Sequence, residues 1–112
     1  MPAARRFLRT ALLPLESQGA GRELAETLIV AGTELATNAV VHARTEFTVR
    51  VLLEATLVRL EVSDGSSGVP EPLPATTDAT SGRGLAIIAG SGLAWGVQRH
   101  PGGKTVWVEA AR

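Results

Sequence analysis

The spacing of hydrophobic and polar residues predicts two helices in the first third of the chain. Apolar side chains recur at helical spacing over residues 3–13, and this first helix is expected to end before Pro14. A turn over residues 17–21 leads into a long helix from about Arg22 to His42. One buried stripe of that helix is expected to contain Leu24, Leu28, Leu35 and Ala39, with Ala25, Ile29, Ala36 and Val40 beside it.

Alternating apolar and polar positions then predict a pair of strands. The segments FTVRVLL (47–53) and LVRLEVSD (57–64) each place apolar side chains on one face. The link between them, residues 54–56, is short enough for an antiparallel hairpin. In the second strand, Asp64 continues the alternation of Val58, Leu60 and Val62, so its side chain is expected to point toward the core.

The remaining third of the chain predicts a long loop, a helix and a second hairpin. Residues 65–82 are rich in Gly, Ser, Thr and Pro and predict the loop, and RGLAIIAG (83–90) predicts the helix. Two further strands, LAWGVQR (93–99) and KTVWVEA (104–110), are joined by a turn at 100–103. Helices on one face of a mainly antiparallel sheet indicate a two-layer α+β sandwich.

Length and composition narrow the class of protein. The 112 residues fit one domain, 1–112, and 45% of them are hydrophobic. There is no cysteine, which excludes disulfides and thiolate chemistry. Eleven basic residues balance eleven acidic ones, so no direct contact with nucleic acid is indicated. No apolar run suits a signal peptide or a membrane span, and we expect a cytoplasmic protein that does not bind a membrane.

Polar side chains follow one edge of the long predicted helix. Glu34, Asn38 and His42 are four residues apart, so they drift by about 40° per step and lie at the border of the buried stripe. A solvated helix edge explains this spacing without any function. A carboxylate and an amide oxygen at this spacing also suit Mg²⁺. His42 by itself is better explained as a packing or capping residue at the helix end.

Asp64 is the sharper candidate, because an inward carboxylate without a partner costs several kcal/mol. It therefore requires a donor. A local backbone N–H in an Asx-type turn before Gly65 is one alternative, and a ligand with an amino group, such as adenine, is the other.

Glycines flank the predicted long loop at both ends, and the sequence GRGL opens the helix that follows it. Backbone N–H groups at a glycine-rich helix start can bind phosphate, although most such glycines are only turns. The segment GGKT (102–105) is not a Walker A motif, because its first glycine would fall at Gln98 and a strand follows in place of a helix.

Taken in order, the segments ELATNAVVHA, DGSSGVP, GRGLAII and GGKTVWVE resemble the Bergerat-fold ATP-binding domain of gyrase-type ATPases and histidine kinases. The closest resemblance is to the small anti-sigma-factor serine kinases, and it covers roughly Ala3 to Ala110. It implies a mixed, mainly antiparallel sheet covered on one face by helices, with ATP and Mg²⁺ as ligands.

The resemblance also implies roles for individual residues. Glu34 matches the general base, Asn38 the Mg²⁺ ligand and Asp64 the acceptor for the adenine amino group. Residues 69–82 match the ATP lid. The remaining nucleotide-binding positions implied are Gly68 of the first glycine box, Gly82, Arg83, Gly84 and Leu85 of the second, and Thr105 near the adenine.

These matches lead us to expect a kinase that transfers the ATP γ-phosphate to a serine or threonine of an antagonist protein and binds a sigma factor. A homodimer is compatible with the resemblance. The alternative is a nucleotide-dependent interaction module without phosphotransfer, which Ser66 favours because it replaces the middle glycine of the first box. A third alternative, the catalytic domain of a longer histidine kinase, is favoured less because no phosphoacceptor helix pair precedes Ala3.

Overall fold

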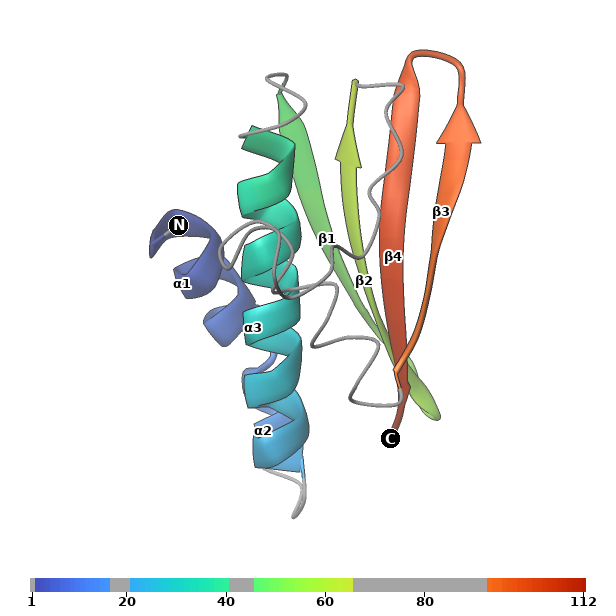
Figure 1. Ribbon diagram of the computed structural model, residues 1–112. Coiled ribbons are helices and arrows are strands. Elements are labelled where there is room, and N and C mark those ends of the chain that lie inside the picture. Colours follow the sequence, from blue (N-terminus) through green and yellow to red (C-terminus); the bar gives the residue numbers. More distant parts are fainter. Residues whose placement is uncertain (1, 17–20, 41–45, 66–92) are drawn as a thin grey trace, which may run out of the picture.

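The protein is built from two layers, helices on one side and an antiparallel sheet on the other (Figure 1). The computed structural model describes residues 2–16, 21–40, 46–65 and 93–112. In chain order the described elements are the helices α1 (Pro2–Ala11), α2 (Leu13–Glu16) and α3 (Gly21–Asn38), and the strands β1 (Phe47–Leu53), β2 (Leu57–Asp64), β3 (Ala94–His100) and β4 (Gly103–Ala111).

The described strands form one sheet in the order β1-β2-β4-β3. Each neighbouring pair is antiparallel, so the two hairpins, β1-β2 and β3-β4, are joined side by side through β2 and β4. The predicted α+β sandwich is confirmed. The mixed character expected of the sheet is not found among these strands, since none of the described pairings is parallel.

The core lies between α3 and the inner face of the sheet. At Gly32, α3 packs tightly against both α1 and the sheet, because a Cβ there would lie 2.8 Å from Leu8 of α1 and 3.2 Å from Leu60 of β2. The long helix is therefore enclosed by α1, α2 and the sheet together, which explains why Ala31, Gly32 and Thr33 are buried as well as most positions of the predicted stripes.

One buried position predicted for the long helix is wrong. Val40 is 44% exposed, although Ala39 before it is buried. The α-helix ends at Asn38, and residues 39–40 continue as a wider π-helical turn. Because a π-turn holds more residues than an α-turn, positions beyond Asn38 no longer follow the 100° spacing.

The first helix ends at Ala11, before Pro14 as predicted. The short helix α2 that follows was not predicted, and Pro14 is its second residue. Proline is compatible with the first turn of a helix because the N–H that it lacks would have no helical partner there. Arg9 of α1 donates to Glu26 of α3 at 2.9 Å and ties the two helices together on their solvent side.

The β3-β4 hairpin turns at Pro101 and Gly102, within the predicted turn. Gly102 has a φ of +86°, a conformation that glycine adopts without a steric penalty. The loop over 66–82 and the helix over 83–90 lie outside the described residues. Within the described part of the chain, no helix is both long and apolar enough to span a membrane.

Candidate functional site

Glu34 and Asn38 lie one turn apart at the end of α3, where the sequence pattern placed them. Both residues are half-buried. The Oδ1 atom of Asn38 is fully buried, yet it has no hydrogen-bond partner among the residues that the structure describes. A buried oxygen of this kind costs about 1 to 3 kcal/mol, so its retention suits a ligand that the protein alone does not supply.

Four side chains form a row across the inner face of the sheet at the same end of the molecule. The strand register aligns Phe47 of β1 with Asp64 of β2, Asp64 with Lys104 of β4, and Lys104 with Arg99 of β3. The end of β2 and the start of β4 lie at the same end as the carboxyl terminus of α3 (Figure 1). The helix edge and this row therefore belong to one region.

Asp64 points inward and is 8% exposed, which confirms the orientation predicted from the alternation of β2. Its carboxylate accepts a hydrogen bond from the Lys104 ammonium, with Oδ1 and Nζ 3.0 Å apart. The sequence analysis considered a local backbone N–H and the amino group of a ligand as donors to Asp64, and it did not consider this lysine. The pair forms because antiparallel pairing places Asp64 and Lys104 directly opposite each other on one face of the sheet.

The turn before Lys104 holds this pair together. A Cβ at Gly103 would collide with the backbone oxygen of Asp64, so only glycine allows β4 to start so close to the end of β2. Gly103 and Lys104 are the site residues that the sequence analysis missed. The signal that could have found Lys104 is the alternation of KTVWVEA, which puts the lysine on the same face as Val106 and Val108.

Thr105 lies on the other face of the sheet. It is paired with Ser63, and the two hydroxyl oxygens are 2.7 Å apart. The Nε2 atom of His100 lies 3.2 Å from the same threonine oxygen. Because neighbouring residues of a strand point to opposite faces, the Thr105 hydroxyl points away from the Asp64 carboxylate. This position does not support the expected contact between Thr105 and adenine.

The outer face of the sheet carries a network of salt bridges around Arg59. Its guanidinium donates to Glu61 at 2.8 Å and to Glu109 at 2.6 Å, and it stacks 4.6 Å from the centre of the Trp107 ring. The hydrogen bond to Glu61 raises the pKa of Arg59, burial partly opposes that rise, and the bond to Glu109 adds to it. These charges pair with one another, which is typical of a structural network.

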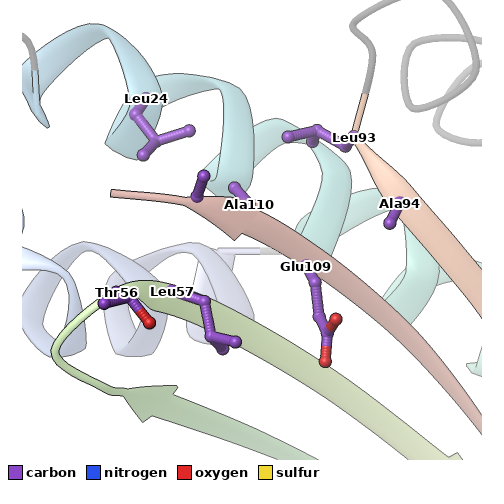
Figure 2. A pocket seen from close by; sticks show the side chains of 8 residues that line it. Leu24, Thr56, Leu57, Leu93, Ala94, Glu109 and Ala110 are labelled. Carbon is purple, nitrogen blue, oxygen red and sulfur yellow. The ribbon is translucent and has the colours of Figure 1, made fainter.

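A separate, mostly apolar pocket opens at the opposite end of the sheet (Figure 2). Its walls include Leu24 of α3, Leu57 at the start of β2, Leu93 and Ala110. In the close-up, the Glu109 side chain points away from Leu24 and Leu93. Asp64 is at the far end of β2 from this pocket, so the pocket and the polar row are distinct features.

Several predicted site residues lie outside the described residues: Gly68, Gly82, Arg83, Gly84, Leu85 and the lid over 69–82, along with His42 and Ser66. Among the residues that the structure does describe, no group of three or more histidine and acidic side chains could hold a metal ion. Mg²⁺ in proteins commonly keeps several waters and binds through one or two protein ligands together with substrate phosphates.

Comparison with known families decides the class of this arrangement. The histidine kinase-like ATPase domain family matches residues 1–110. The chain belongs to that family. It is thus an ATP-binding, histidine kinase-like ATPase domain with the Bergerat fold, and the family resemblance predicted from the sequence is confirmed at this level.

Solved structures show the same fold. The histidine kinase domain of a blue-light activated histidine kinase from Erythrobacter litoralis EL346 is 19% identical with a TM-score of 0.60, covering 95% of this chain and 63% of that one. A second structure of the blue-light activated kinase is 22% identical with a TM-score of 0.57, covering 78% of this chain and 30% of that one. This chain therefore spans less than two thirds of either relative. No curated protein matches.

Proposed function

We propose that this domain is an ATP-dependent protein serine/threonine kinase of the anti-sigma type, which phosphorylates an antagonist protein and binds a sigma factor. Membership of an ATP-binding family supports the nucleotide. The observation that carries the proposal is the end of α3, where an acidic side chain lies one turn from a buried amide oxygen that has no partner in the described part of the chain.

Asn38 suits Mg²⁺ because its buried Oδ1 is an uncharged oxygen ligand that is already desolvated and unpaired. When bound with ATP, Mg²⁺ neutralises the negative charge that develops on the phosphates. Asn38 would hold one position of the metal, and Asp64 would accept a hydrogen bond from the amino group of adenine. The phosphate-binding positions Gly68, Gly82, Arg83, Gly84 and Leu85 remain part of the proposal through the family resemblance.

Glu34 would act as the general base. It is half-buried on the same helix edge as Asn38, one turn earlier, so its carboxylate can face a hydroxyl that approaches the nucleotide phosphates. A carboxylate in this position would accept the proton of the attacking serine or threonine hydroxyl as the new O–P bond forms and the bond from the γ-phosphorus to the bridging oxygen breaks, which releases ADP.

A nucleotide-dependent interaction module without phosphotransfer is the second candidate. One feature of the sequence favours it: Ser66 stands where the middle glycine of a D-x-G-x-G box belongs. A side chain at this position restricts the positive φ values that glycine allows. Such a module would bind ATP and its partner protein but would form no phosphoprotein.

One incubation separates the candidates. The protein is mixed with ATP labelled at the γ-phosphate and a candidate antagonist, and the product is treated with acid. An acid-stable phosphoprotein supports the serine/threonine kinase, since phosphoserine survives acid and phosphohistidine does not. Absence of a phosphoprotein despite ATP binding would favour the interaction module, and an acid-labile product would indicate a histidine kinase.

Two substitutions test the assigned roles. Glu34→Ala removes the base and is expected to reduce phosphotransfer by at least about 100-fold with ATP affinity nearly unchanged. Asp64→Asn replaces the acceptor with a group that also presents N–H donors, and is expected to weaken ATP binding by about tenfold or more. Equal losses of ATP affinity in the two variants would contradict this division of roles.

A further inference from the structure

Lys104 is the single lysine of the chain, and it is buried. Lysine is among the residues least often found inside proteins, and burial of its charge requires a partner. The side chains of Lys104 and Asp64 are 8% and 4% exposed, and their charged atoms are 3.0 Å apart. A buried ion pair therefore includes the carboxylate that we assign to the nucleobase.

Stability alone does not explain this pair. The next pair along the same face is Val62 opposite Val106, and both residues are buried. Replacing a buried ion pair by apolar residues of similar volume is often neutral or stabilising. A second apolar pair would thus serve the sheet equally well, and the retained charges point to recognition of a ligand.

The ammonium group has donors to spare. A lysine ammonium carries three N–H groups, and in the described part of the chain Lys104 donates only to Asp64. Two of its N–H groups are therefore left for a ligand. Lys104 and Asp64 lie opposite each other in adjacent strands, so a donor and an acceptor are presented next to each other at the inner end of the sheet.

We propose that Lys104 is a nucleobase-binding residue that donates a hydrogen bond to N1 of adenine while Asp64 accepts one from the 6-amino group. This rests on the proposed function and deepens it, since it names the specificity of the same site. Adenine presents a donor, the amino group, beside an acceptor, N1, and the Asp64–Lys104 pair presents the complementary order. Guanine presents the reverse, an acceptor at O6 beside a donor at N1, and would place like groups together.

The first test changes the ligand and leaves the protein intact. The wild-type chain is titrated calorimetrically with ATP, with 1-deaza-ATP, which lacks only the N1 nitrogen, and with purine riboside triphosphate, which lacks only the amino group. Each analogue is expected to bind about tenfold or more weakly than ATP, because a hydrogen bond to a charged group is lost. Equal affinity for ATP and 1-deaza-ATP overturns the proposal.

The second test changes the lysine. Lys104→Met is expected to weaken ATP binding by about tenfold and to remove the preference for ATP over 1-deaza-ATP, because the partner of N1 is gone. Lys104→Arg keeps a cationic donor and is expected to retain that preference. Arg59→Met is the matched control. It removes a cation that pairs with carboxylates of β2 and β4 on the outer face, and it should leave the preference for ATP over 1-deaza-ATP unchanged.

The outcomes are distinguishable. If Lys104→Met weakens ATP and 1-deaza-ATP by the same factor, the lysine only supports the structure and the inference is wrong. If Lys104→Met does not fold, the wild-type ligand series decides by itself. If the wild-type chain binds ATP and 1-deaza-ATP with equal affinity, this inference fails and the proposed function stands. If the chain binds no adenine nucleotide, both are overturned.

Discussion

The two faces of the β2-β4 pair carry similar residues in different environments. On the outer face, Arg59 contacts two carboxylates and an indole ring, and the three ionic side chains are between 16% and 32% exposed. On the inner face, Lys104 and Asp64 form a pair that is almost fully enclosed, and the unpartnered Asn38 oxygen lies at the same end of the molecule.

The difference separates charges that satisfy one another from the charges that we propose to bind a ligand. Solvent screens the outer network and its members satisfy one another, so the loss of one contact is tolerated. The inner pair is desolvated, which makes each charge costly without its partner and strongly attractive to a complementary ligand. Burial together with unused hydrogen-bonding capacity distinguishes the face that we propose to bind ATP better than the number of charges does.

The largest expected effect is the difference in free energy of unfolding between two single variants, each of which removes a cation from one face of the sheet. Lys104→Met should reduce the free energy of unfolding by about 3 to 5 kcal/mol, because a buried carboxylate loses its counterion. Arg59→Met should cost only about 1 kcal/mol. Urea denaturation of both variants measures the contrast, and similar losses in the two variants would refute the distinction between the faces.

A smaller effect is expected at Gly96, which tests the packing of the outer face. A Cβ at this glycine would lie 2.6 Å from Cζ2 of Trp107, so the indole, which stacks with Arg59, would have to move. Gly96→Ala should cost about 1 to 3 kcal/mol and change the tryptophan fluorescence, without altering ATP affinity. A loss of ATP binding in this variant would show that the two faces are not independent.

The smallest effect is expected at the exposed pair between α1 and α3. The hydrogen bond from Arg9 holds the pKa of Glu26 below its usual value of 4.5. Because this pKa is lower in the folded state, the stabilisation is present above the unfolded value and disappears as pH falls through the folded one. The stability difference between wild type and Glu26→Gln should therefore be small at neutral pH, vanish in acid and shrink in 1 M salt. A difference that grows in acid would contradict this sign.

Local patterns predicted the orientation of Asp64 and the spacing of Glu34 and Asn38, because strand alternation and helical periodicity depend only on neighbouring residues. The Asp64–Lys104 pair could not be predicted in this way, since its residues are 40 positions apart and meet only through the register of β2 with β4. Thr105 illustrates the same limit. Neighbouring positions in a strand face opposite ways, so the shift of one residue from Lys104 places Thr105 on the outer face.

The central claim is that ATP binds at the inner end of the sheet with Mg²⁺ held by Asn38. Calorimetric titration of the wild-type chain and of Asn38→Leu with ATP, with and without Mg²⁺, tests it most directly. We predict that Mg²⁺ strengthens ATP binding to the wild type by about tenfold or more and has little effect on the variant. Absence of heat with ATP in either condition, or an equal Mg²⁺ effect in both proteins, would contradict the account.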